Sequence, residues 1–267
     1  MRLRRISAIA AVAAAVAATT AAVYPSAPAD RLQPMPALTA PALAARYAAD
    51  AHQIARAAGA ASRSGNTGLA SSLRAMRGGR FLDFNPRGQG LAVEVFGNLA
   101  TATRVAIIVP GSDTSLATFD SRGTASPEGA ARALTAQART LDPHARLAVI
   151  AWLGYKTPST FSPAVMTSGD AGQGADALRP FVDDLVRHGH QVALLCHSYG
   201  SVLCGLAAAH LPVTDIAVYG SPGMDASSVG ALVWSEATEE ASIPGLPNTA
   251  MSVTGRCGAA SPQTTEP

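Results

Sequence analysis

The chain has 267 residues, of which 48% are hydrophobic and 14% are charged. This length suits one large α/β domain with appendages, and the apolar content is ample for a core. A net charge of +2 is too small to indicate a nucleic acid or an acidic surface as the partner. The three cysteines, Cys196, Cys204 and Cys257, are not spaced as zinc ligands, so we expect no bound metal and no cofactor.

The first 29 residues have the pattern of an export signal. A basic start, MRLRR, precedes the apolar run ISAIAAVAAAVAATTAAV, and APA at residues 27–29 is a small-x-small cleavage site. The apolar run at 6–23 is also just long enough to span a thin bilayer, so an uncleaved membrane anchor is the alternative. Both interpretations place the protein outside the cytoplasm, either secreted or in the cell envelope.

Residues 30–40 are rich in proline and predict a linker. Two alanine-rich segments follow, and Gly65-Asn66 separates them, which predicts a helical hairpin over residues 41–79. Short strands are then expected at RFLDFN and GLAVEVFG, the second of which partly alternates between apolar and polar residues.

Strands and helices alternate four times in the next part of the chain. TRVAIIVPG is typical of a strand covered on both faces. SPEGAARALTAQARTL predicts a helix with Ser126 as the N-cap and Pro127 at its first position. Then come the strand RLAVIAWLG, a loop at 154–174, the helix ADALRPFVDDLVRHG, the strand HQVALLCH, the helix YGSVLCGLAAAHL and the strand DIAVYGSPG. Pro180 marks either a kink or the start of its helix. The alternation predicts an α/β fold with a mainly parallel sheet and helices on both faces.

Ser198 lies where an apolar strand gives way to a helix of small residues. The segment CHSYGS, residues 196–201, resembles the G-x-S-x-G pattern of a nucleophile elbow, with Cys196 in place of the first glycine. Such a turn is so tight that the residues two before and two after the nucleophile must be small. The nucleophile occupies strained backbone, and the N-terminus of the next helix faces it. The pattern predicts Ser198 as a nucleophile; the alternative is a serine in an ordinary turn.

A second segment, IIVPGSDTS, ends an earlier buried strand in Pro-Gly-Ser. In enzymes with a nucleophile elbow of this type, the loop after that strand donates one oxyanion-hole N–H, and the residue after the nucleophile donates the other. The matching positions are Ser112 or Gly111 for the first donor and Tyr199 for the second. A plain Pro-Gly turn is the alternative.

These motifs resemble those of the α/β-hydrolase superfamily, and within it a secreted actinobacterial branch of unknown function. The resemblance rests on VPGSDTSLATFD, AWLGYKTPST, CHSYGSVLCG and YGSPGMDASSVGAL, and it covers residues 80–234, the expected hydrolase core. It implies a serine hydrolase, esterase- or lipase-like, that acts on an ester, amide or similar acyl bond of a small-molecule substrate.

The acid and the base of a triad are harder to place. The acid follows a late strand, and Glu239, beyond the apolar ALVW at 231–234, is the first candidate. Asp225 is the second, and a solvated loop carboxylate is the alternative for each. No histidine follows His210, which ends the elbow helix. Most earlier histidines are too far from Ser198 or face away from it: His144, His188, His190 and His197. His52, in the helical hairpin, is unconstrained by this argument.

From Ser235 the sequence has no apolar run suited to a last strand and no closing helix. We therefore expect residues 235–267 to be an irregular tail and the fold to lack its last strand and helix. Either the C-terminus is truncated or altered in frame, or the triad is defective. We therefore expect a weak or inactive hydrolase. The alternative is a binding or envelope protein that retains the hydrolase fold.

The two cysteines beside Ser198 raise one more possibility. The elbow helix doubles back along its strand, so Cys196 and Cys204 can approach within the ~4.4–6.8 Å Cα separation of a disulfide. Two unbonded small residues in a tight strand–helix contact are the alternative.

Overall fold

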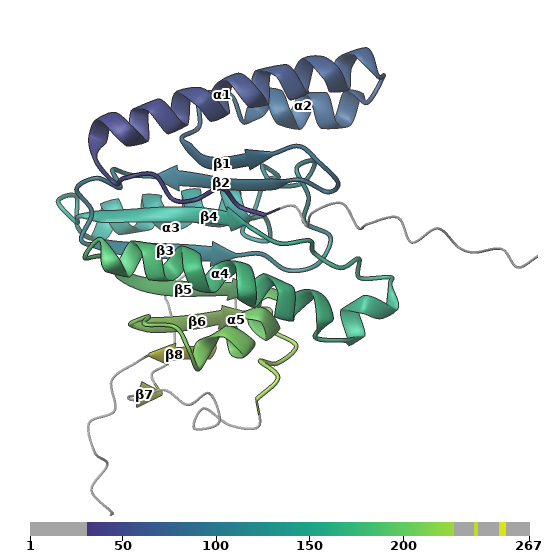
Figure 1. Cartoon of the computed structure of the whole chain (residues 1–267). Coiled ribbons are helices and arrows are strands. Elements are labelled where there is room, and N and C mark those ends of the chain that lie inside the picture. The colour runs from purple at the N-terminus through teal and green to yellow at the C-terminus, as the bar shows by residue number, and fades with distance from the viewer. Residues whose placement is uncertain (1–30, 227–237, 240–250, 255–267) are drawn as a thin grey trace, which may run out of the picture.

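The computed structural model describes residues 31–226, 238–239 and 251–254. Its centre is a sheet with the strand order β1-β2-β4-β3-β5-β6-β8-β7 (Figure 1). Four central strands run parallel: β4 (Leu147–Leu153), β3 (Arg104–Val109), β5 (Gln191–His197) and β6 (Asp215–Tyr219). Antiparallel strands flank them, namely β1 (Phe81–Asn85) and β2 (Leu91–Phe96) on one side and β8 (Met251–Thr254) and β7 (Thr238–Glu239) on the other.

Helices cover both faces of this sheet. Figure 1 shows α4 and α5 in front of it, α3 behind it, and α1 and α2 beside β1. The helix bounds are α1 (Ala40–Arg63), α2 (Thr67–Ala75), α3 (Pro127–Leu141), α4 (Gly169–Arg187) and α5 (Gly200–Ala208), with a short 3-10 turn at Pro163–Met166. The prediction of an α/β-hydrolase fold, with a parallel sheet centre and helices on both faces, is confirmed.

The buried strand β3 shows why two layers of helices are needed. Val105, Ile107 and Val109 belong to the apolar core beneath α4 and α5, while Ala106 and Ile108 belong to the core that α1, α2 and α3 share. Successive side chains of a strand point to opposite faces, so a continuous apolar run must be covered twice.

Side-chain caps mark the starts of two helices, α2 at Asn66 and α3 at Ser126. At the start of α3, the Ser126 hydroxyl accepts a hydrogen bond from the Gly129 N–H at 3.2 Å, and Pro127 occupies the first turn. Both predictions are confirmed there. Pro180 lies inside α4, which begins at Gly169, so the interpretation of Pro180 as the helix start is wrong.

The segment predicted as a linker packs against the domain. Leu38 is buried, and Leu32 and Met35 contact the same core. Two hydrogen bonds from the Arg46 guanidinium, to the carbonyls of Pro34 at 3.0 Å and Leu82 at 2.8 Å, tie this segment and α1 to β1. Composition alone does not predict this packing, because the few apolar side chains that make it are scattered among prolines.

The hairpin of α1 and α2 is part of the same domain. Its buried residues share one core with Phe81, Phe84 and Phe119 and include Ile54, Ala58, Ala61, Ala70 and Leu73. Alanine on every side of α1 hid this packing face from the sequence analysis.

Beyond β6, the expectation of a wholly irregular tail is wrong for six residues. Strand β8 pairs antiparallel with β6, and β7 pairs antiparallel with β8. Backbone hydrogen bonds to β6 can hold a strand as short as MSVT, so no long apolar run is needed. The strand expected at 231–234 and the export signal at 1–29 lie outside the described residues. Over the described ranges, no helix is long and apolar enough to cross a membrane.

Candidate active site

Ser198 lies at the turn between β5 and α5, on the carboxyl edge of the parallel strands. Its φ is +50°, in the left-handed region that costs a non-glycine residue about 1–2 kcal/mol. Its N–H donates a hydrogen bond to the Tyr219 carbonyl at the end of β6, at 3.0 Å. A strained serine between a buried strand and a helix is the geometry of a nucleophile elbow.

Glycines allow the backbone to pack closely around this turn. A Cβ at Gly200 would lie 2.6 Å from the Pro110 carbonyl oxygen and 2.7 Å from that of Val109. A Cβ at Gly111 would lie 2.7 Å from the Cβ of Ser198 and 3.2 Å from its Oγ. The end of β3 therefore lies directly against the elbow, which brings Gly111 beside the candidate nucleophile.

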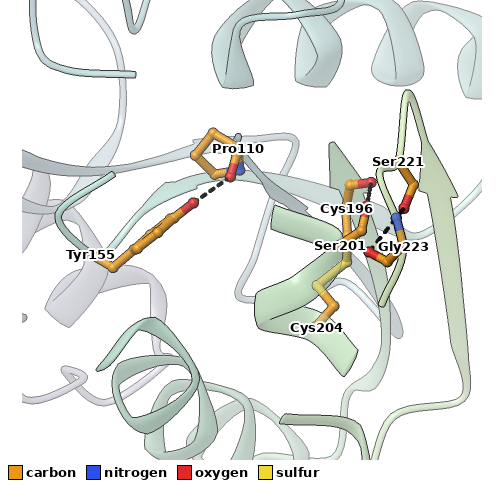
Figure 2. Close-up of a disulfide and its surroundings, with 7 residues drawn as sticks. All are labelled: Pro110, Tyr155, Cys196, Ser201, Cys204, Ser221 and Gly223. Carbon is orange, nitrogen blue, oxygen red and sulfur yellow. Dashed lines mark hydrogen bonds between the residues drawn. A yellow bond between two sulfur atoms is a disulfide. The ribbon is translucent and has the colours of Figure 1, made fainter. Parts of the chain in front are cut away.

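A disulfide joins β5 to α5 beneath Ser198. Cys196 and Cys204 are bonded with a Cα separation of 6.5 Å, and both side chains are buried. Figure 2 shows the bond between strand and helix, with the Ser201 hydroxyl donating to the Cys196 carbonyl at 3.3 Å. Of the two alternatives that the sequence left open, the structure has the disulfide and not two unbonded small residues in contact.

The candidate oxyanion donors are the backbone N–H groups of Ser112 and Tyr199. In the part of the chain that the structure describes, neither the Ser112 N–H nor the Tyr199 N–H donates a hydrogen bond. The structure brings Ser112 close to the nucleophile because it directly follows Gly111. Free donors at such positions stabilise the negative charge that develops on a carbonyl oxygen under attack.

The loop that carries Ser112 is held from outside by the loop after β4. The Tyr155 hydroxyl donates to the Pro110 carbonyl at 2.8 Å (Figure 2). The Asp113 N–H donates to the Pro158 carbonyl at 2.9 Å, and the Thr157 hydroxyl donates to the Thr114 carbonyl at 2.8 Å. These contacts fix the loop before any substrate arrives, as an oxyanion hole requires.

Sequence analysis missed Tyr155 and Asp113 as supporting residues. Tyr155 lies inside the AWLGYKTPST motif, but the sequence of this motif does not reveal that the tyrosine hydroxyl binds a carbonyl 45 positions away. Asp113 has a φ of +58°, and its carboxylate accepts from the Thr160 N–H at 3.1 Å. Hydrogen bonds from Thr160 hold the pKa of the Asp113 carboxyl below its usual value.

Tyr199 has a second role through its side chain, which is buried. Its hydroxyl donates to the Thr167 carbonyl at 2.5 Å and accepts from the Ala171 N–H at 3.2 Å. Desolvation raises the pKa of this phenol, so it stays protonated as a donor. Tyr199 therefore anchors the elbow to the first turn of α4.

Within the described residues, no hydrogen bond joins the Asp225 carboxylate to a histidine. Asp225 is exposed, has a φ of +54°, and follows β6. For Glu239 the structure gives its place in β7, and its side chain is outside the described part. Both assignments remain predictions.

All six histidines lie in the described residues, and none forms a hydrogen bond with Ser198. The His197 ring packs on Tyr219 with ring centroids 4.9 Å apart, and its Nδ1 is buried without a partner. Desolvation lowers the pKa of this imidazole, so its neutral form is favoured. His190 contacts the Ala102 carbonyl at the far end of β5, and the remaining histidines are exposed: His52, His144, His188 and His210.

The described ranges hold no group of three or more histidine, cysteine or acidic side chains arranged to bind a metal ion.

A family model described as alpha/beta hydrolase matches residues 85–240, more than half of the chain. The chain belongs to the α/β-hydrolase family. The match includes the elbow and the loop after β3 but begins after the α1–α2 hairpin. In this α/β-hydrolase the hairpin lies outside the matched residues and shares an apolar core with them.

The α/β-hydrolase also resembles two uncharacterized proteins of Mycobacterium tuberculosis, from strains CDC 1551 and H37Rv. Each is 37% identical over 147 residues, which is 52% of this chain. The matched part spans 22% of the length of these relatives. The similarity supports a shared domain and carries no information about substrates.

Proposed function

We propose that the protein is a serine hydrolase that cleaves an ester or amide bond of a small molecule through Ser198. The observation that carries the proposal is the left-handed backbone of Ser198, φ +50°, between β5 and α5. Strain of this kind persists only where the surrounding structure holds it, and it is concentrated at functional sites.

In the proposed reaction, Ser198 Oγ attacks the carbonyl carbon, and its proton leaves to a base. The carbonyl oxygen becomes an oxyanion that accepts hydrogen bonds from the Ser112 and Tyr199 N–H groups. Collapse of this intermediate expels the protonated alcohol or amine and leaves an acyl group on Ser198. Water then attacks the acyl carbon, which releases the acid and restores the serine hydroxyl.

The missing partner is the base. Because no histidine forms a hydrogen bond with Ser198, we propose that this polypeptide turns over esters slowly. An oxyanion hole and substrate binding without a working triad give only ~10³–10⁴-fold acceleration over water.

A second function is favoured by the position of His197, whose ring faces Tyr219 and not the nucleophile. On this alternative, the hydrolase fold serves as a binding or envelope protein without catalysis. The free N–H groups beside Ser198 would then contribute to ligand binding only.

A fluorophosphonate probe separates the two. We expect labelling of the folded protein that is lost in Ser198→Ala and kept in Ser221→Ala, a serine after β6 at the same edge of the sheet. The absence of labelling in folded wild-type protein, or labelling that survives Ser198→Ala, would overturn the hydrolase proposal.

We propose that the protein acts outside the cytoplasm. The disulfide between Cys196 and Cys204 supports this location, because such bonds persist in oxidising compartments. N-terminal sequencing of protein from the culture medium tests it: a first residue of Asp30 indicates cleavage after APA. Recovery in the membrane fraction with Met1 retained indicates an anchor, and recovery in the cytoplasm contradicts the proposal.

A further inference from the structure

A cavity of about 800 Å³ lies beyond the carboxyl end of β4, and β3 separates β4 from β5 and its elbow. Its walls are the β1–β2 turn at residues 87–91, the start of the loop after β4 at 154–156, and the middle of α4. Ser198 itself does not line it. The volume falls within the range of about 300–1,000 Å³ that small-molecule sites occupy.

Three cations line this cavity: Arg31, Arg87 and Lys156. The one carboxylate in its lining, Asp176, already accepts from the Arg179 guanidinium at 2.7 Å. Within the described ranges, the side chains of the three cations form no ion pair and donate no hydrogen bond. The cavity therefore concentrates unpaired positive charge in a chain whose net charge is only +2.

Two parts of the cavity wall, the loop after β4 and the β1–β2 turn, form hydrogen bonds with the loop after β3, which carries Gly111 and Ser112. The Tyr155 hydroxyl donates to the Pro110 carbonyl at 2.8 Å, and the Leu116 N–H donates to the Gln89 carbonyl at 3.1 Å. Pro110 directly precedes Gly111, which lies against Ser198. The loop after β3 thus joins the wall of the cavity to the residues packed against Ser198.

Guanidinium and ammonium groups bind carboxylate and phosphate oxygens through charge-assisted hydrogen bonds. Arg31, Arg87 and Lys156 are exposed, and a neutral acyl chain has no charged oxygen to accept hydrogen bonds from them. We propose that the cavity binds the carboxylate- or phosphate-bearing end of the substrate whose acyl bond Ser198 attacks. The assignment to a substrate rests on the proposed function, whereas binding of the anion does not.

Lys156 is the single lysine of the chain, so its chemical modification gives a clean readout. The Ser198→Ala full chain is treated with neutral N-hydroxysuccinimidyl acetate, and acetylation of Lys156 is followed by mass spectrometry. Monomethyl glutarate and butyl phosphate are the anionic probes, and dimethyl glutarate is the neutral control. We expect the anions to slow acetylation about threefold at twice their dissociation constant.

The Arg87→Gln variant should weaken this protection about tenfold in dissociation constant, because a charge-assisted hydrogen bond is lost. Arg104→Gln, an exposed arginine at the opposite end of the parallel strands, should leave it unchanged. Equal protection by the neutral diester, or no protection by either anion, overturns the proposal.

Turnover separates this proposal from the hydrolase proposal. For wild-type protein we expect a higher kcat/KM for mono-4-nitrophenyl glutarate than for 4-nitrophenyl valerate, and loss of that preference in Lys156→Gln. Protection by anions without any Ser198-dependent turnover keeps the anion site and removes the hydrolase. Turnover with no preference for the charged ester keeps the hydrolase and overturns the assignment of the cavity to its substrate.

Discussion

At the scale of single residues, Ser198 is half-buried and has a left-handed φ of +50°. The left-handed φ favours glycine, so the serine is held there at a cost of about 1–2 kcal/mol. We expect Ser198→Gly to have a free energy of unfolding about 1 kcal/mol higher than Ser198→Ala. Ser71, exposed inside α2, is the control, where glycine should be about 1 kcal/mol less stable than alanine. Urea unfolding measures the difference in free energy of unfolding between the glycine and alanine variants at each position. The same sign of this difference at Ser198 and Ser71 would contradict the left-handed backbone of Ser198.

Gly111 tests how closely the loop after β3 approaches the nucleophile. In Gly111→Ala, the new Cβ meets Ser198 Cβ at 2.7 Å and the His197 carbonyl oxygen at 3.0 Å, so the loop must move. We expect about 1–3 kcal/mol of destabilisation and a loss of at least about tenfold in the rate of fluorophosphonate labelling. Gly172→Ala in α4, where the Cβ meets nothing within 4 Å, should be neutral or stabilising. Unchanged labelling in Gly111→Ala would show that the loop is not at the nucleophile.

Among helices and strands, those with a strong apolar pattern are predictable from sequence, and those held by distant partners are not. The apolar run from Val105 to Val109 predicts a strand buried on both faces, and the structure places this strand at the centre of the sheet. Strand β8 depends on backbone pairing with β6, which leaves no signal in four residues. The elbow was found because its steric demands fix residue size at Cys196 and Gly200. The role of Tyr155 was missed because hydrogen bonds between loops leave no such local mark.

The pairing of β5 with α5 gives a test of the disulfide. Closing a loop with a sequence separation of 8 restricts the unfolded chain, and loss of the bond should cost roughly 2–3 kcal/mol. We expect this destabilisation in the Cys196→Ala/Cys204→Ala variant, measured by thermal unfolding. With iodoacetamide in denaturant, wild-type protein should take up one adduct without reductant and three after reduction, since the chain has 3 cysteines. Three adducts without reductant would rule the bond out.

At the scale of the whole molecule, several carboxyl groups of the described residues are buried. Asp50 and Asp83, where α1 meets β1, are buried, and each has a carboxylate oxygen without a hydrogen-bond partner. Desolvation and the Asp83 charge, opposed by Arg46, raise the pKa of Asp50 to about 6. Desolvation also raises the pKa of Asp83. The docking of α1 on the sheet is therefore more favourable when these carboxyls hold a proton.

Glu94 on β2 makes the same effect measurable. Desolvation raises the pKa of Glu94 from 4.5 to about 8, and the nearby carboxylates of Glu128 and Asp120 act in the same direction. The Arg132 charge opposes this increase. The folded state therefore keeps a proton on Glu94 that the unfolded chain releases, so the contribution of Glu94 to stability is greatest below pH 4.5 and is lost as pH rises through about 8.

We accordingly expect Glu94→Gln, which keeps the shape and removes the charge, to raise the free energy of unfolding at pH 8 by more than about 1 kcal/mol. At pH 4, where Glu94 is protonated in both states, the variant and wild-type protein should be equally stable. The measurement is urea unfolding at a series of pH values, with Asp225→Asn, at an exposed carboxylate, as a control of unchanged profile. A difference between Glu94→Gln and wild-type protein that stays constant from pH 4 to pH 8 would assign the effect to packing and refute a buried, protonated Glu94.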